Sequence, residues 1–156
     1  MLFTAFNLSG PAAVRYPRGA AVGDAPREMN ALSVGKAEVR RAGKRVAILA
    51  FGSMLKPALE AGQALDATVV NMRFVKPLDV DVIREVARTH ELIVTVEEHQ
   101  VMGGAGSAVC EVLGGGTKVL LLGLPDRFID HGDPGRLLAS VGLDAAGIQQ
   151  AIKSAL

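Results

Sequence analysis

The sequence contains no tryptophan, one tyrosine and five phenylalanines among its 156 residues. Because proteins that bind single-stranded nucleic acid stack the bases on aromatic side chains, this composition argues against that class. The formal net charge is only +1, so no strong field attracts nucleic acid or an anionic membrane. No apolar run reaches the roughly 18 residues that a membrane-spanning helix needs. We therefore expect neither nucleic acid nor a membrane as a partner.

Sites built from cysteine or from clustered histidine are also missing. The single cysteine, Cys110, excludes an internal disulfide and a cysteine-based zinc cluster, and we expect it to pack as a small hydrophobic residue on the core face of a helix. His90, His99 and His131 lack the spacing of a metal-binding motif. We predict a structural role for His90 at a helix end, and we place the other two in loops, where functional residues are common. The amino terminus has no basic leader, so we expect no signal peptide and a cytoplasmic location.

What the sequence does have is a regular alternation of two patterns. Hydrophobic residues make up 49% and charged residues 21%, which is typical of a globular domain. From residue 33 onward, short apolar runs alternate with segments of helical periodicity, which predicts an α/β fold. The polar run at residues 36–41 suits an edge strand, and a hairpin-like turn at Gly43 allows it to run antiparallel. We predict a three-layer α/β/α sandwich with a mostly parallel five-stranded sheet and one antiparallel edge strand. The other strands are expected at residues 46–51, 67–72, 92–96 and 118–122, and the helices at 54–65, 80–90, 105–113, 134–141 and 145–152. We expect Asp79 and Asp144 to cap the helices that follow them.

The stretch from residue 92 to residue 113 has the order strand, glycine turn, helix. A helix N-terminus after such a turn attracts anions, so Gly103, Gly104 and Gly106 are candidates for contact with a phosphate. However, the spacing is not Gly-x-Gly-x-x-Gly, and the carboxylates of Glu97 and Glu98 would repel a phosphate unless they were turned away. Two interpretations stay open: close packing of the backbone at the glycines, or the ligand-binding turn of a nucleotide-binding domain.

The first 32 residues do not follow the alternating pattern. Residues 2–8 suit a short amphipathic helix, and residues 12–16 suit a strand that Pro17 would end. One helix and one strand cannot bury a core of their own. We therefore predict that residues 1–19 are the tail of another domain, residues 20–32 a polar linker and residues 33–156 the α/β domain.

Candidate ligand-binding residues lie where the strands end, because open parallel sheets bind ligands at the carboxyl ends of their strands. Arg73 is expected there to form a salt bridge across an interface. The predicted strand ends carry Ser53, Arg73, Glu97, Glu98 and Asp126.

Arg18 follows the predicted amino-terminal strand and stands between Pro17 and Gly19. Its guanidinium is suited to bind a phosphate through two parallel hydrogen bonds. A structural ion pair is equally compatible with the local sequence, so both roles remain open from the residues alone.

Four motifs in a fixed order resemble one enzyme family. They are GPAAVRYPRG at residues 10–19, NMRFVKPLD at 71–79, VTVEEHQVMGGAGSAV at 94–109 and GLPDRFIDHG at 123–132. Together they resemble the 1-deoxy-D-xylulose-5-phosphate synthases, a family of transketolase-like enzymes that use thiamine diphosphate. The resemblance spans nearly the whole chain, and it covers the last strand of the family's middle domain and the whole of its C-terminal domain.

The resemblance implies an enzyme that condenses pyruvate with glyceraldehyde 3-phosphate with loss of CO2, for isoprenoid, thiamine and pyridoxal synthesis. It implies a homodimer whose thiamine diphosphate and Mg2+ are held by the preceding domains. The segment itself is then expected to bind neither cofactor, to hold no catalytic or metal-binding residue and to be inactive alone. Arg18 matches the arginine of the family's Tyr-Pro-Arg-Gly motif, which helps to hold the substrate phosphate. Two alternatives remain: a non-catalytic module for self-association or partner binding, and the C-terminal domain of another transketolase-like enzyme.

Overall fold

The structure, a computed structural model, describes residues 1–17 and 28–156. Within those two ranges the chain forms five strands, six α-helices and one short 3-10 helix, η1. The strands are β1 (Glu38–Arg41), β2 (Val46–Ala50), β3 (Thr68–Asn71), β4 (Leu92–Gln100) and β5 (Val119–Leu124). The helices are α1 (Leu2–Phe6), η1 (Gly52–Met54), α2 (Leu55–Leu65), α3 (Val80–Thr89), α4 (Ala105–Leu113), α5 (Pro134–Ser140) and α6 (Ala145–Ala155).

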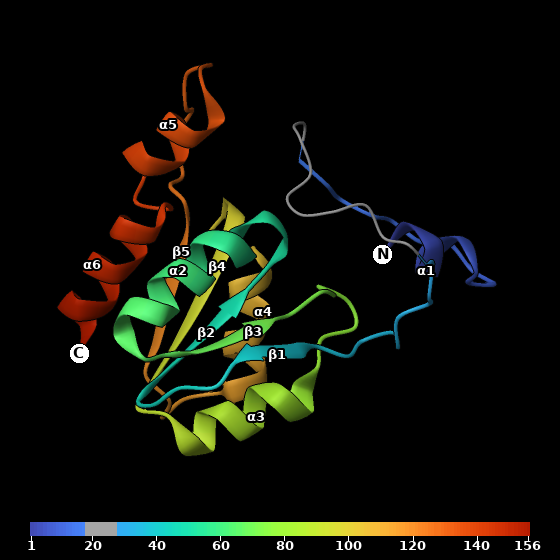
Figure 1. Ribbon diagram of the computed structural model, residues 1–156, viewed down its shortest axis with the longest axis horizontal. Coiled ribbons are helices and arrows are strands. Elements are labelled where there is room, and N and C mark those ends of the chain that lie inside the picture. The colour runs from blue at the N-terminus through green and yellow to red at the C-terminus, as the bar shows by residue number, and fades with distance from the viewer. Residues whose placement is uncertain (18–27) are drawn as a thin grey trace.

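The strands of the described chain form one sheet in the order β1-β3-β2-β4-β5. β1 pairs with β3 in the antiparallel sense, and all the other neighbouring strands are parallel. Helices cover both faces of the sheet, so the predicted α/β/α sandwich with one antiparallel edge strand is confirmed (Figure 1).

The turn at Gly43 does not make the hairpin that the sequence suggested. β1 lies at the edge beside β3, two positions away from β2, which follows it directly in the chain. The burial of the two strands explains this arrangement. All five residues of β2 are buried, which requires a central position, whereas β1 has exposed residues and tolerates the edge.

Two hydrophobic cores lie on opposite faces of the sheet. Consecutive residues of β2 supply them in turn, because side chains alternate along a strand. Ile48 packs in the core beneath α2 and α6, and Leu49 packs in the core beneath α3 and α4. Both side chains are fully buried, and burial of a side chain of this size contributes about 1.5–3 kcal/mol.

Aspartates begin three of the helices, because a carboxylate accepts a hydrogen bond from a free N–H group of the first turn. Asp79 caps α3, as predicted, and Asp144 caps α6. Asp133 caps α5, whose first position is Pro134. The cap bonds run from Val82 N, Arg136 N and Gly147 N to the three carboxylates.

Asp79 has a second role, because it also holds the segment that leads into β1. Its Oδ2 accepts a hydrogen bond of 2.9 Å from the N–H of Ala37, and the side chain is only 3% exposed. Burial opposes ionisation, but the N–H groups of Ala37 and Val82 and the charge of Lys36 outweigh it and lower the pKa of Asp79. The carboxylate therefore ties the edge strand to α3.

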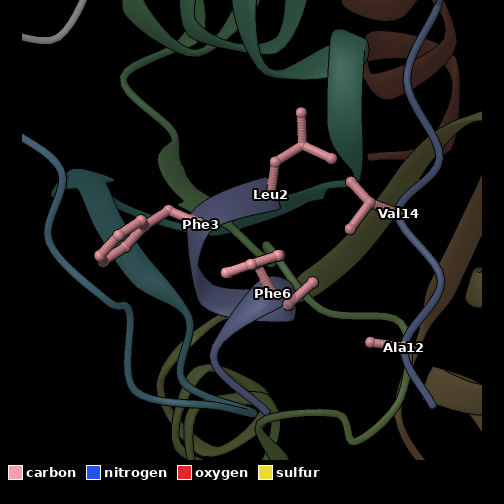
Figure 2. A pocket seen from close by; sticks show the side chains of 6 residues that line it. Leu2, Phe3, Phe6, Ala12 and Val14 are labelled. Carbon is pink, nitrogen blue, oxygen red and sulfur yellow. The ribbon is translucent and has the colours of Figure 1, made fainter.

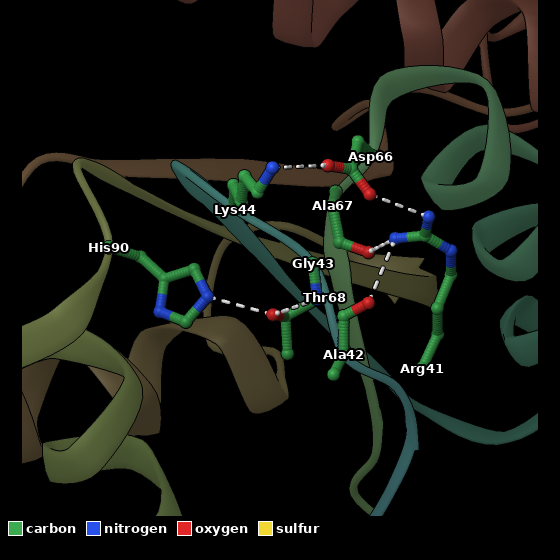
Figure 3. A network of polar contacts seen from close by, with 8 residues as sticks. All are labelled: Arg41, Ala42, Gly43, Lys44, Asp66, Ala67, Thr68 and His90. Atoms are coloured by element: carbon green, nitrogen blue, oxygen red, sulfur yellow. Dashed lines mark hydrogen bonds and ion pairs between the residues drawn. The ribbon is translucent and has the colours of Figure 1, made fainter.

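A polar network closes the sheet at the amino-terminal ends of its parallel strands (Figure 3). Arg41 Nη2 lies 2.8 Å from Asp66 Oδ1, and the N–H of Gly43 donates to Thr68 Oγ1 at 3.0 Å. The ring of His90 contacts the same hydroxyl through Nε2 at 2.8 Å, and its Nδ1 lies 3.0 Å from the Val86 carbonyl oxygen. His90 thus has the structural role predicted for it, joining the end of α3 to β3.

Residues 1–17 form a tail that stands apart from the sandwich (Figure 1). The helix expected at its start is present as α1, but the strand expected at residues 12–16 is wrong, since these residues have no strand assignment. A strand needs a hydrogen-bonded neighbour, and the described chain offers this segment none. The buried Thr4 ties the start of the tail to the segment before β1, because its Oγ1 accepts a hydrogen bond of 2.9 Å from the N–H of Leu32.

None of the helices in the described ranges combines the length and the apolar composition that crossing a membrane would require.

Candidate functional site

The carboxyl end of β4 differs from the sequence prediction. The predicted strand stops at residue 96, but β4 continues through Glu97 and Glu98 to Gln100. Its pairing with β5 passes through an irregularity between Val96 and Gln100, and Gln100 then lies opposite Leu124. The two glutamates therefore belong to the sheet, and their side chains follow the alternation of a strand rather than projecting together from a loop.

Glu97 points inward and closes the N-terminus of α4. Its Oε2 accepts a hydrogen bond of 2.8 Å from Ala105 N, and its Oε1 accepts one of 2.8 Å from Gly106 N. The residue is 5% exposed. These are the free N–H groups that would bind a phosphate at a helix N-terminus. An anionic ligand could bind here only by displacing Glu97.

The glycines around this carboxylate allow close packing of the backbone. A Cβ on Gly104 would overlap the carbonyl oxygen of Gln100 and the carboxylate of Glu97. A Cβ on Gly106 would lie 2.5 Å from Thr95 Oγ1, while Gly103 has a φ of +71° that disfavours other residues. The close-packing interpretation of the turn is therefore correct, and the nucleotide-binding interpretation is not supported.

Glu98 points the other way and meets residues from two other segments. Ser53 Oγ, from the turn after β2, donates a hydrogen bond of 2.5 Å to Glu98 Oε2. Arg15 Nη2, from the tail, donates one of 2.7 Å to the Glu98 carbonyl oxygen. The helix after β2 covers one face of the sheet and the helix after β4 covers the other. Ser53 and Glu98 therefore lie at the topological switch point, where sheets of this type bind ligands.

The remaining strand-end residues do not join this cluster. Arg73 forms a salt bridge of 2.5 Å with Glu38 Oε2, which ties the loop after β3 to β1. This ion pair lies within the chain, whereas the expected one crosses an interface. Asp126 accepts a hydrogen bond of 3.3 Å from Gln100 Nε2, farther along the same edge of the sheet.

The three histidines and the cysteine do not come together in a metal-binding or reactive cluster. His99 and His131 are exposed, and Cys110 is half-buried, so the expectation of a core cysteine is wrong. Ala105, Gly106 and Val109 are the residues of α4 that are buried in the core, and Cys110 lies at the edge of this buried face. In residues 1–17 and 28–156, no three side chains of histidine, cysteine, aspartate or glutamate are grouped to hold a metal ion.

Arg18 lies outside the described residues, so its predicted phosphate-binding role stays a prediction. The tail that leads to it presents an apolar surface. Figure 2 shows Leu2 and Phe6 of α1 on one side of an open hollow and Ala12 and Val14 of the extended segment on the other, while the ring of Phe3 points away from that segment. The exposed fraction of Phe6 is 88%, and that of Tyr16 is 73%. The hollow is lined by Leu2, Phe3, Ala5, Phe6, Ala12 and Val14.

The cofactors implied by the family resemblance do not fit the described part of this chain. A diphosphate needs free N–H groups or cationic side chains, and the best-placed helix N-terminus already holds the carboxylate of Glu97. A magnesium ion needs grouped oxygen ligands, and no such group is present among the described side chains.

The sequence matches the family model described as "Transketolase, C-terminal domain" over residues 35–148. It is 59% identical to the 1-deoxy-D-xylulose-5-phosphate synthase of Nitrosomonas europaea over 157 residues. It is 61% identical to the enzyme of the same name from Paraburkholderia xenovorans over 162 residues. Each alignment covers 98% of this chain but only 26% of the relative, so the chain spans about a quarter of their length. The resemblance deduced from the four motifs is confirmed.

Two solved structures have a similar fold. A structure described as "Split gene transketolase, inactive beta4 tetramer" superposes with a TM-score of 0.75. It is 39% identical, over 81% of this chain and 44% of that one. The transketolase of Campylobacter jejuni superposes with a TM-score of 0.56 and 16% identity, over 77% of this chain and 18% of that one. The second likeness concerns the fold alone.

Proposed function

The chain belongs to the transketolase C-terminal domain family, and from this membership we propose that it acts as the carboxy-terminal part of a 1-deoxy-D-xylulose-5-phosphate synthase. Such an enzyme would condense pyruvate with glyceraldehyde 3-phosphate with loss of CO2. The observation that carries the proposal is the identity of about 60% with synthases of that name over 98% of this chain. A C-terminal domain of some other transketolase-like enzyme would not be expected to match these synthases over nearly its whole length.

The domain division that we propose places residues 1–19 with a preceding middle domain, residues 20–32 in a linker and residues 33–156 in the C-terminal domain. Two observations support it. The family match begins at residue 35, after the proposed linker. The apolar side chains of α1 are exposed, and exposed apolar patches of this kind mark surfaces that contact another protein or domain.

We propose a supporting role, without direct catalysis, for the sandwich. Its helix N-terminus after the glycine turn is closed by its own Glu97, and the residues at its switch point bind one another. Thiamine diphosphate and Mg2+ would be held by the preceding domains, and the sandwich would support those domains and the contact between two subunits. A solved relative is described as a tetramer of its β chain, which is compatible with self-association in this family.

The cofactor proposal can be tested by titrating thiamine diphosphate and Mg2+ into this chain in a calorimeter. We expect no heat of binding, because residues 1–17 and 28–156 supply neither an open anion site at the glycine turn nor grouped metal ligands. The complete enzyme, titrated in the same way, is the control and should bind. Saturable binding by this chain alone would contradict the proposal that the preceding domains hold both cofactors.

Arg18 is the residue that we propose to contact substrate, by binding the phosphate of glyceraldehyde 3-phosphate. The change Arg18→Ala in the complete enzyme should raise the KM for this substrate about tenfold or more, since a charge-assisted hydrogen bond is lost. The KM for pyruvate should stay nearly constant. Arg84→Ala removes an arginine from an exposed position on α3 and is the matched control. An unchanged KM for glyceraldehyde 3-phosphate would refute the role.

A further inference from the structure

We propose that the carboxyl edge of the sheet is the surface on which the preceding domain of the complete enzyme docks. The inference rests on the proposed function, because that domain would come from the part of the synthases outside the 26% of their length that this chain matches. It adds the face of the sandwich that is covered and the side chains that the contact buries.

Exposed apolar side chains of the sandwich gather at this edge. Six large apolar side chains of residues 33–156 are exposed, and four of them lie at the carboxyl edge. Three are in the loops that follow β3, β4 and β5, and the fourth precedes β1, whose first residue pairs with the last residue of β3. Such a grouping marks a contact surface, whereas apolar residues that are exposed singly do not. The four are Val75, Met102, Phe128 and Val34, and the other two are Val39 and Leu156.

The opposite edge of the sheet has the reverse composition. The connections that precede the parallel strands, residues 42–45, 66–67, 90–91 and 114–118, hold none of the six. They hold ion pairs instead: Arg45 Nη2 lies 2.9 Å from Glu91 Oε2, and Asp66 binds Arg41 at the end of β1. The amino edge is therefore suited to water, and the carboxyl edge is suited to a protein surface.

Phe128 has the features of an interface anchor. Its side chain is fully exposed, but the loop that carries it starts from a fixed base. The N–H of Val101 donates a hydrogen bond of 3.2 Å to the carbonyl oxygen of Leu124, so the loops that carry Met102 and Phe128 start side by side. Aromatic residues and methionine are enriched in protein interfaces, which makes this pair the expected centre of the contact.

The tail identifies the occupant, because both side-chain hydrogen bonds that join it to the rest of the described chain fall at this edge. Arg15 Nη2 donates to the Glu98 carbonyl oxygen at 2.7 Å, near the end of β4. Thr4 Oγ1 accepts from the N–H of Leu32, two residues before Val34. Figure 1 shows the tail on the side of the sandwich where β1 begins. The domain to which we assign the tail therefore approaches the sandwich from the carboxyl edge.

Hydroxyl-radical footprinting, read by mass spectrometry, tests the surface by comparing this chain with the complete enzyme. We expect the labelling rates of Phe128 and Met102 to fall about fivefold or more in the complete enzyme, because the core of an interface excludes solvent. Val39 and Leu156, the exposed apolar residues outside this edge, are the references and should keep their rates. Unchanged rates for Phe128 and Met102, or an equal fall at all four residues, would overturn the proposal.

The same measurement, repeated over a range of protein concentrations, identifies the occupant. If the preceding domain of the same polypeptide covers the edge, protection in the complete enzyme should not depend on concentration. Protection of this chain alone that grows with its concentration would make a second copy the occupant. Protection of the complete enzyme that disappears on dilution would place the contact between subunits. Either of these results would refute the proposal.

A matched pair of variants gives an independent measurement, since Val75 is 57% exposed and Val39 is 55% exposed. Val75→Ser should lower the Tm of the complete enzyme by about 2 °C more than that of this chain, whereas Val39→Ser should act equally on both proteins. Equal shifts for Val75→Ser in the two proteins would contradict the docking surface. Synthase activity is assayed in parallel. An active enzyme with an unprotected edge refutes this inference alone, whereas a complete enzyme without synthase activity refutes the proposed function and its footprint still reports the docking.

Discussion

The sandwich buries the apolar side chains of its strands, whereas the tail leaves apolar side chains exposed. In β2 all five residues are buried, and the two faces of the strand supply two separate cores. In the tail, α1 leaves Leu2 65% exposed and Phe6 88% exposed. The hydrophobic effect makes such exposure unfavourable, which supports the proposal that another domain covers the tail, whereas the sandwich buries its apolar residues within the chain.

The backbone shows the same difference. The central strands β2, β3 and β4 each hydrogen-bond to a neighbouring strand on both sides. Residues 12–16 have a comparable β-type sequence but form no strand. An extended sequence becomes a strand only where another strand receives its hydrogen bonds. This difference is compatible with the proposal that the tail belongs with a preceding domain.

The largest loss of stability is expected from Glu97→Ala. The change removes the acceptor of two buried N–H groups at the start of α4 and leaves a cavity beside the glycine turn. We expect the free energy of unfolding to fall by about 3 kcal/mol or more. Urea denaturation of this chain, followed by circular dichroism, would measure it.

Glu98→Ala is the matched control for that experiment. Glu98 is the neighbouring residue and the same amino acid, but its side chain is only partly buried and binds one hydroxyl, that of Ser53. Its removal should cost about 1 kcal/mol or less. Equal losses for the two variants would contradict the assignment of Glu97 as the internal cap of α4.

The next largest effect is expected from Gly104→Ala. The added methyl group would overlap the carbonyl oxygen of Gln100, which belongs to the backbone and cannot turn aside. We expect a loss of about 2 kcal/mol from this overpacking. Gly103→Ala meets open space and pays only for its positive φ, so about 1 kcal/mol is expected. Thermal melting of both variants would rank them, and the reverse order would refute the packing argument.

Asp79→Ala should have a smaller effect that depends on pH. Loss of the cap and of the bond from Ala37 should cost about 1–2 kcal/mol at neutral pH. The pKa of Asp79 is lower in the folded chain than its ordinary value of 3.8. A lowered pKa gives stability that is full above the unfolded value and disappears as the pH falls through the folded one. The difference between wild type and Asp79→Ala should therefore shrink in strongly acidic buffer.

Asp79→Asn tests the charge separately, because asparagine can cap a helix without ionising. Unfolding experiments from neutral to acidic pH should show an intermediate stability for this variant. If the difference between wild type and Asp79→Ala did not change across that range, the carboxylate would not be the source of the stability.

Most of the sandwich could be predicted from the sequence because local signals and burial agree there. Apolar runs became central strands, and Asp79 and Asp144 began their helices as expected. The prediction of a hairpin at Gly43 was wrong. Which strand lies beside β2 depends on the burial of all the strands together. Patterns in a short window do not contain that information.

The candidate site was predicted only in part. Ser53 and Glu98 were expected at strand ends, and the structure brings them together. Glu97 was misread as a residue after the strand, because two consecutive carboxylates after an apolar run suggest the end of a strand. The missed signal was the glycine turn itself, since the free N–H groups of Ala105 and Gly106 require an acceptor nearby. Arg15 had no local signal, as its partner is 83 positions away.

The smallest effect on this chain is expected from Phe6→Ser, which tests whether the exposed face of α1 packs against another domain. Phe6 is 88% exposed on α1, so its loss should change the unfolding free energy of this chain by less than about 0.5 kcal/mol. In the complete enzyme, where we propose that another domain covers this surface, the same change should lower the melting temperature by several degrees. A clear destabilisation of this chain alone would mean that the tail packs on the sandwich. Equal melting temperatures for the complete enzyme and its Phe6→Ser variant would mean that nothing covers α1, and the tail would then need another explanation.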